Sequence, residues 1–101
     1  MTATIYRIVT EAEWESARAS GVFAGSEHDL RDGFIHFSTA EQLRETAEKH
    51  YAGRTGLLLL TVDAGVLTRL KWEVSRGGAL FPHLYGPLPA SAVRGVEAFS
   101  V

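Results

Sequence analysis

The first segment of the chain alternates between apolar and polar residues and then shows a helix start. Residues 4–9 are rich in β-forming side chains and predict a strand. Thr10 and Glu13 follow in the spacing of a capping box, in which a hydroxyl and a carboxylate satisfy the first backbone N–H groups of a helix. A short helix is expected there, with Trp14 and Ala17 on its inner face. Gly21 stands where a left-handed residue would end it.

The same combination of strand and helix start returns in the middle of the chain. Phe34–Phe37 is a short apolar run that predicts a buried strand. Ser38 and Glu41 have capping-box spacing, so a second helix is expected from Thr39 to about Tyr51. Gly53 supplies its stop.

Strand patterns dominate the second half. Residues 57–63 form an uninterrupted apolar run, which is typical of a central strand covered on both faces. Residues 67–74 alternate as in a half-exposed strand, with one side made of Leu70, Trp72 and Val74. Proline interrupts the aromatic segment 80–86 and favours an edge strand or irregular structure there. Residues 93–99 predict the last strand.

The remaining segments connect these elements. Residues 23–32 are charged and flanked by glycine, so we expect a surface loop, and residues 75–78 predict a turn. The order β-α-β-α-β-β-β-β, with helices early and strands late, predicts an α+β fold with a largely antiparallel or mixed sheet. At 101 residues the chain is expected to form a single domain spanning 1–101.

Composition narrows the class of protein. Hydrophobic residues make up 46% and charged residues 22%, as in an ordinary globular protein, and the net charge of −2 disfavours a nucleic-acid-binding face. The chain has no cysteine, which excludes a thiolate nucleophile and a cysteine-based metal site. Residues 1–4 lack the features of a signal peptide, and no apolar run is long enough to cross a bilayer, so we expect a cytoplasmic protein with no membrane partner.

His36 is the unusual residue, because it places an ionisable imidazole inside an apolar strand. Such a histidine is commonly a packed residue whose ring nitrogens bond to backbone or hydroxyl groups. Alternatively, the helix that starts directly afterwards offers free N–H groups to a phosphate or carboxylate, and His36 would then belong to a ligand site. The residues alone leave both interpretations open.

Two other chemistries are disfavoured. A metal site would require His28, Asp32 and His36 to converge, but a loop would leave their geometry undefined and the spacing fits no compact ligand motif, so no metal is predicted. A serine hydrolase would use Ser38 with His36 or His83 as base. The chain lacks the G-x-S-x-G turn of such enzymes, however, and Ser38 is expected to cap a helix.

Three further features have two interpretations each. Arg7 is either solvated on the first strand or, if that face lines a cleft, a fixed cation for phosphate or ribose. Glu73 is either an exposed strand residue or the best-placed carboxylate for chemistry. Residues 81–88 form either an aromatic edge on the core, with His83 exposed, or a stacking wall for a flat ligand.

Several segments together resemble the bacterial "domain of unknown function 952" family. They are Ile5–Ile8, Trp14-Glu15, Gly33–Gln42, Leu58-Leu59, Trp72-Glu73 and Leu80–Leu88. The blocks G-F-I-H-x-S-T and L-F-P-H-x-Y-G-P-L are long, and the resemblance covers nearly the whole chain. The chain is therefore identified as a member of that family, which has no established activity.

This resemblance implies a compact split-sheet fold similar to that of the ADP-ribosyltransferases, with two main helices and a cleft that holds NAD. By position, Arg7 matches the first motif of that superfamily, and His36 with Ser38 and Thr39 matches the second. Residues 35–38 (IHFS) also resemble the V-H-L-S motif of the RNA 2′-phosphotransferases, which makes an RNA end a candidate partner. On the late strands no E-x-E or Q-x-E pair occurs, which argues against an ordinary mono-ADP-ribosyltransferase unless Glu73 substitutes.

The implied site has two sets of residues. The cofactor-binding set comprises Arg7 for ribose or phosphate, His36 at the cleft floor, Ser38 and Thr39 for an anionic group, and Phe81 and Tyr85 for stacking. The catalytic candidates are His36, Glu73 and His83, with Glu73 as the carboxylate that would stabilise a positive ribose centre. The implied function is NAD or nucleotide binding with ADP-ribosyl or phosphate transfer; the alternative is a non-catalytic module that binds a small ligand or a protein on the same scaffold.

Overall fold

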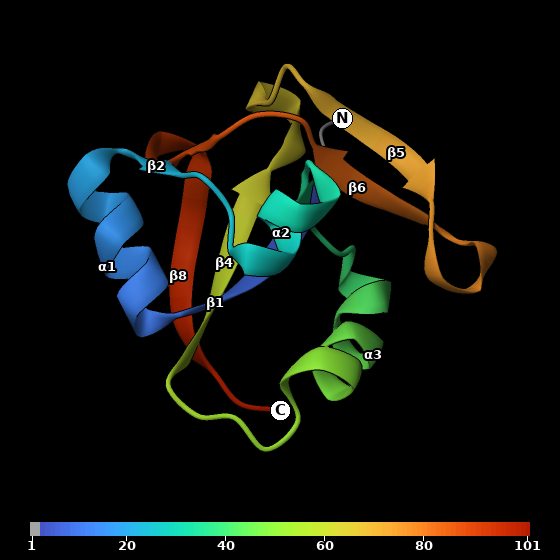
Figure 1. Ribbon diagram of the computed structural model, residues 1–101, viewed down its shortest axis with the longest axis horizontal. Coiled ribbons are helices and arrows are strands. Elements are labelled where there is room, and N and C mark those ends of the chain that lie inside the picture. The colour runs from blue at the N-terminus through green and yellow to red at the C-terminus, as the bar shows by residue number, and fades with distance from the viewer. Residues whose placement is uncertain (1–2) are drawn as a thin grey trace.

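The computed structural model describes residues 3–101, and at position 76 it describes the backbone alone. Its largest sheet is antiparallel and has the order β1 (Thr4–Thr10), β4 (Leu57–Asp63) and β8 (Val93–Phe99) (Figure 1). The apolar run forms β4, which is the central strand, as expected. Its alternate residues pack into two separate cores. Leu60 and Val62 belong to the larger core, whereas Leu57 and Leu59 belong to a smaller one.

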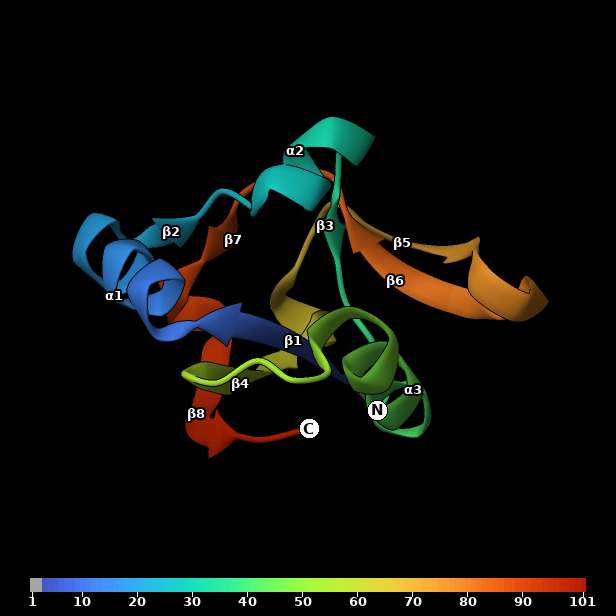
Figure 2. The same ribbon diagram turned by 60° about the horizontal axis from the view of Figure 1, so that its bottom comes forward.

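A second antiparallel sheet has the order β3 (Ile35–His36), β6 (Leu80–Leu84) and β5 (Leu70–Val74). It joins the first sheet through one bridge, in which Tyr6 N donates to Ser38 O at 2.8 Å and Ser38 N donates to Tyr6 O at 2.9 Å. From this bridge the two sheets diverge (Figure 2). A two-stranded ladder of β2 (Val22–Phe23) and β7 (Leu88–Pro89) completes the β structure of the described residues. The same part of the chain contains three short 3-10 helices, at Ala64–Val66, Arg76–Gly78 and Ala90–Ala92.

Within residues 3–101, three α-helices flank these sheets: α1 (Glu11–Ser20), α2 (Glu27–Asp32) and α3 (Ala40–Tyr51). The first begins and ends as predicted, because Thr10 and Glu13 form the capping box and Gly21 adopts a φ of 91° at the C-cap. Ala17 on α1 packs in the larger core, with Trp14 partly buried beside it. The structure confirms the α+β class.

The prediction of a surface loop at residues 23–32 is wrong, because this segment contains part of β2 and the whole of α2. Ser26 is the N-cap of α2, and the third helical residue, Asp29, bonds back to Ser26 as the partner in a capping box. Gly33 ends the helix with a φ of 86°. The two predicted helices are both present, and α2 is an additional short helix whose capping box ends in Asp where Glu or Gln is more usual.

The predicted cap of α3 is displaced by one residue. The N-cap is Thr39, whose hydroxyl accepts from Gln42 N, while Gln42 Oε1 accepts from Thr39 N. Ser38 and Glu41 satisfy the same spacing rule, but Ser38 is held in the bridge to β1 and cannot turn into the helix. Its hydroxyl donates instead to Thr46 at 3.1 Å.

Two strand predictions in the second half are also wrong. Pro82 lies in β6, the middle strand of its sheet, and not at an edge. The carbonyl of Pro82 accepts a hydrogen bond from Phe37 N, on the side of β6 that faces β3. Because the N and the C=O of a strand residue point to the same side, the nitrogen of Pro82 also faces β3. The short β3 ladder has ended at this point, so no ladder bond is lost through the missing N–H. In β5, the predicted apolar side is covered only at Leu70, because Trp72 and Val74 are exposed. Glu73, on the other side of the strand, is half-buried.

The expectation that the chain carries no signal peptide concerned residues 1–4, of which Met1 and Thr2 lie outside the described part. Among the helices formed by residues 3–101, none is long and apolar enough to cross a membrane.

Candidate functional site

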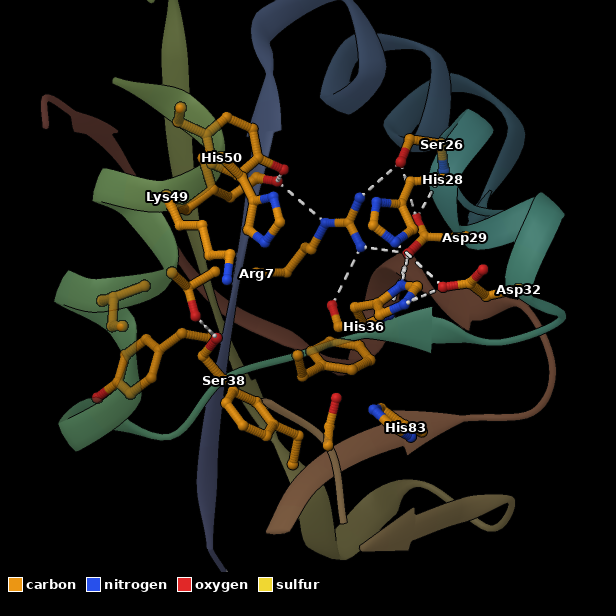
Figure 3. Close-up of a pocket in the computed structure, with 18 of the residues that line it drawn as sticks. Arg7, Ser26, His28, Asp29, Asp32, His36, Ser38, Lys49, His50 and His83 are labelled. Atoms are coloured by element: carbon orange, nitrogen blue, oxygen red, sulfur yellow. Dashed lines mark hydrogen bonds and ion pairs between the residues drawn. The ribbon is translucent and has the colours of Figure 1, made fainter. Parts of the chain in front are cut away.

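A cavity of about 560 Å³ opens between α3 on one side and α2 with β3 on the other, and residues of β1 form its floor (Figure 3). Tyr6, Arg7 and Ile8 line the floor, and His36 and Ser38 lie beside it. The bridge between β1 and Ser38 therefore lies at the point where the two sheets separate and leave this space.

Arg7 is buried at the floor, and most of its guanidinium N–H groups donate hydrogen bonds to other groups of the protein. Its Nη1 donates to Asp29 Oδ1 at 2.7 Å and to the carbonyl of His36 at 3.0 Å, and its Nη2 donates to Ser26 Oγ at 2.8 Å. Its Nε donates to the carbonyl of Ile8 at 3.0 Å. Four of the five guanidinium N–H donors are thus used, and three of them tie β1 to α2 and β3.

Asp29 is the centre of this network, and the sequence analysis did not single it out. Its Oδ1 accepts from Arg7, from the backbone N–H of His36 at 3.0 Å and from His36 Nδ1 at 2.6 Å, while Oδ2 accepts from Ser26. Burial opposes ionisation, but the hydrogen bonds from His36 and Arg7 and the charge of Arg7 outweigh it, so the pKa of Asp29 lies well below its ordinary value. The signal that could have identified it is the S-x-x-D spacing from Ser26.

His36 is held between two carboxylates. Its Nδ1 contacts Asp29 as described, and its Nε2 lies 2.9 Å from Asp32 Oδ2. Burial opposes ionisation of Asp32 as well, but its hydrogen bond from His36 and its proximity to His28 lower its pKa below the ordinary value. The ring is 30% exposed, so one edge remains open to the cavity.

His28 completes a cluster with these two residues. His28 Nε2 lies 3.1 Å from Asp32 Oδ2, and the ligand-capable atoms of His28, Asp32 and His36 all lie within 4.8 Å of one another. The premise on which a metal site was disfavoured is therefore wrong. Residues 27–32 form a helix, and a helix places His28 and Asp32, four residues apart, on the same face.

An aromatic wall closes the cavity near β6. Phe34 stacks on His83 with ring centroids 4.0 Å apart and an interplanar angle of 26°, and Phe81 lines the cavity beside them. His83 is buried and not exposed, because Phe34 covers its ring. This wall contains two of the predicted residues, Phe81 and His83, together with Phe34.

Glu73 and Tyr85 support His83 from outside the cavity. Glu73 Oε1 accepts from Tyr85 Oη at 2.7 Å and contacts His83 Nδ1 at 2.8 Å, and neither Glu73 nor Tyr85 is among the lining residues. The hydrogen bonds from Tyr85 and His83 lower the pKa of Glu73, and the bond to Glu73 raises the pKa of Tyr85.

The opposite wall comes from α3 and the residues that follow it. Lys49, His50 and Arg54 line the cavity with Tyr51, whose hydroxyl donates to the carbonyl of Ile8 at 3.3 Å. Burial raises the pKa of Tyr51. The cationic residues of this wall were not singled out from the sequence, although Lys49 and His50 stand in the last turn of a predicted helix.

The structure thus brings most of the predicted site residues to one place. Arg7, His36, Ser38, Phe81 and His83 line the cavity, whereas Glu73 and Tyr85 lie behind its wall and Thr39 serves as a helix cap. The fold and this cavity define a small α+β protein with a polar and aromatic cavity between two diverging sheets.

Comparison with known proteins identifies the family. Residues 8–96 match the family described as "Protein of unknown function (DUF952)", and the chain belongs to it. A crystal structure of protein CC0527 from Caulobacter crescentus is 50% identical, with a TM-score of 0.94 over 98% of this chain and 88% of that one. Its solution NMR structure is 52% identical, with a TM-score of 0.86 over 97% and 85%. No significant match is found among curated proteins.

Proposed function

We propose that this protein binds NAD or a related nucleotide in the cavity between α3 and β3. The observation that carries the proposal is the pairing of two different walls across one space. Lys49 and Arg54 provide positive charge on the α3 side, and Phe34 with Phe81 provides flat apolar surface on the β6 side. A nucleotide combines phosphates with a planar base, and the volume of about 560 Å³ falls within the ~300–1,000 Å³ of small-molecule sites.

The two walls suggest how such a ligand would lie. The phosphates would face Lys49 and Arg54, and the base or nicotinamide would stack near Phe34 and Phe81. Ser38, which lines the cavity, remains the proposed partner of an anionic group, whereas the N–H and the hydroxyl of Thr39 are used in the cap of α3. Arg7 would act chiefly by holding Asp29 and His36 in place, because four of its donors already bond to the protein.

Likeness to the ADP-ribosyltransferases supports a ligand of the NAD class. The two sheets diverge from the bridge between Tyr6 and Ser38, which is the kind of split that the resemblance implies. Residues 35–38 lie at this split, and they are the segment with the V-H-L-S likeness to the RNA 2′-phosphotransferases. We therefore include 2′-phosphorylated RNA ends among the acceptors to be tested.

Transfer of an ADP-ribosyl or phosphate group is the reaction we propose for the bound nucleotide. In ADP-ribosyl transfer the bond between the ribose and nicotinamide breaks, nicotinamide leaves and the acceptor bonds to the ribose, and a carboxylate near the positive ribose centre stabilises this step. Asp32 lines the cavity, whereas Glu73 lies behind His83 and would act on that ring instead. Binding without transfer is the second candidate, and it is favoured by the engagement of both ring nitrogens of His36 with protein carboxylates.

Binding is tested by calorimetric titration with NAD, ADP-ribose and AMP. Substituting Lys49→Ala should raise the Kd about tenfold or more, because a charged hydrogen bond to phosphate contributes roughly 1.5–3 kcal/mol. Arg44→Ala is the matched control, since Arg44 is an exposed cation on the same helix but does not line the cavity. No heat of binding with any of these nucleotides, or equal losses in both variants, would overturn the proposal.

Turnover is measured in the same preparation. Release of nicotinamide from NAD, or loss of a 2′-phosphate from an RNA end, would identify a transferase. Nucleotide binding that is lost in His36→Ala, together with no turnover by the parent protein, would favour the non-catalytic module. Reduced stability with unchanged titrations in His36→Ala would leave His36 as a packing residue.

A further inference from the structure

The cluster at the α2 edge of the cavity has the composition of a transition-metal site. We propose that His28, Asp32 and His36 bind a divalent transition-metal ion, with Zn²⁺ as the reference ion. This proposal does not depend on nucleotide binding, because it rests on other side chains than the two walls described above. Two imidazoles and one carboxylate are a ligand set that suits zinc and its neighbours.

The backbone brings the three ligands together from two elements. His28 and Asp32 lie one helical turn apart on α2, and Gly33, with a φ of 86°, turns the chain so that His36 enters from β3. The nitrogen atoms of both rings lie about Asp32 Oδ2, at 3.1 Å for His28 and 2.9 Å for His36. Ligand atoms of a tetrahedral zinc ion lie roughly 3.3 Å apart, given bonds of about 2.0–2.1 Å, so small side-chain movements would admit the ion.

The hydrogen bonding of His36 turns its second nitrogen toward Asp32. Asp29 is a buried acceptor for Arg7 and Ser26, so the contact of 2.6 Å between Asp29 Oδ1 and His36 Nδ1 places a proton on Nδ1. His36 Nε2 then faces a carboxylate oxygen of Asp32 at 2.9 Å, an arrangement that either a second ring proton or a metal ion can bridge. A bound metal ion would take the place of that proton.

The same bond to Asp29 resembles the outer contacts of metal-bound histidines. A ligating histidine usually donates its other N–H to a carboxylate, which fixes the tautomer and the ring orientation. Here Arg7 in turn holds Asp29, so the ring of His36 is positioned by a buried ion pair. Arg7 offsets the charge of one of the two carboxylates, and a bound cation would offset the charge of the other.

The site is accessible and incompletely coordinated. The side chains of His28, Asp32 and His36 are 47%, 35% and 30% exposed, which gives an ion a path from solvent. Three protein ligands leave a fourth position for water or for a ligand in the cavity. A metal here would therefore face whatever the cavity binds.

Metal binding is tested on the whole chain, purified without a polyhistidine tag and without nucleotide. Competition against a chromophoric chelator should show one equivalent of Zn²⁺, and Co²⁺ in its place should give the visible absorption of a low-symmetry site. His28→Ala should weaken Zn²⁺ binding by at least about tenfold, since loss of an outer-shell contact alone costs ~10–100-fold. This variant should fold normally because His28 is a surface residue of α2.

His50→Ala is the matched control. His50 lines the same cavity, with its ring centroid 6.0 Å from that of His28, but it is not a member of the three-residue group. We expect its Zn²⁺ affinity to equal that of the parent protein. Absence of saturable Zn²⁺ binding would show that the cluster is a chain of ion pairs only. Equal losses in His28→Ala and His50→Ala would also overturn the assigned ligand set.

Discussion

Asp29→Asn is the substitution to which the fold should be most sensitive. All atoms that contact the Asp29 carboxylate are donors: Arg7 Nη1, His36 N and His36 Nδ1 at Oδ1, and the N–H and hydroxyl of Ser26 at Oδ2. An asparagine keeps one acceptor oxygen but sets an NH₂ group against the remaining donors. It also leaves the buried guanidinium of Arg7 without its counterion.

The magnitude follows from the burial of the pair. Asp29 and Arg7 side chains are 2% and 7% exposed, and removing one partner from such a pair typically costs about 3–5 kcal/mol. A domain of this size has a free energy of unfolding of roughly 5–15 kcal/mol. Asp29→Asn should therefore remove a large fraction of the stability and loosen the α2 edge of the cavity.

Urea unfolding followed by circular dichroism measures this loss as a lower midpoint with an unchanged slope. Glu15→Gln is the control, because Glu15 pairs with Arg18 at 2.6 Å but both side chains are more than half exposed, and such pairs contribute about 0–1 kcal/mol. The double variant Arg7→Met with Asp29→Asn should cost less than the sum of the single changes. A loss below about 1 kcal/mol in Asp29→Asn would refute the assignment of Asp29 as the buried centre of the network.

Two further predictions concern the other polar contacts. Because the bond between Tyr85 and Glu73 raises the pKa of Tyr85 and lowers that of Glu73, Glu73→Gln should bring phenolate absorbance to lower pH; an unchanged titration would contradict the bond. Ionised Glu73 adds to the free energy of unfolding above its ordinary pKa, and this contribution is lost as the pH falls through the lowered pKa. The parent protein should therefore lose this part of its free energy of unfolding in acid, whereas Glu73→Gln should not. Thr39→Ala should cost about 1 kcal/mol by removing the N-cap of α3, whereas Glu41→Ala should cost less because Glu41 contributes only its charge near the start of the helix; the reverse order in thermal unfolding would restore Ser38 as the cap.

Much of the framework could be predicted because its signals are local. The cap at Thr10, the stop at Gly21 and the apolar run of β4 each depend on a few neighbouring residues, and the structure confirms them. Membership of the DUF952 family could also be predicted, since its motifs are contiguous. The helix α2 was missed although its cap is local, because its box ends in Asp29 where glutamate or glutamine is more usual.

Other features could not be predicted, because contacts between segments far apart in the chain decide them. Ser38 and Thr39 both begin a valid capping box, and the choice depends on the bridge between Ser38 and Tyr6, which joins segments more than thirty residues apart. Pro82 occupies a central strand because β3 is too short to need its N–H. The partial burial of Glu73 in β5 likewise depends on its contacts with His83 and Tyr85, which lie on another strand and the turn after it.

His36 shows the division most clearly. Its place in a short apolar strand before a helix follows from residues 34–42, and those residues suffice to mark it as unusual. Its chemistry depends on Asp29 and Asp32, which a helix and a glycine turn bring to its two ring nitrogens, and on Arg7, which lies 29 residues away in the chain and holds Asp29 in place. The spacing of residues along the chain does not determine such contacts, because the packing of the elements sets the distances between their side chains. For this reason the sequence identified the residue, and tertiary packing supplied its partners.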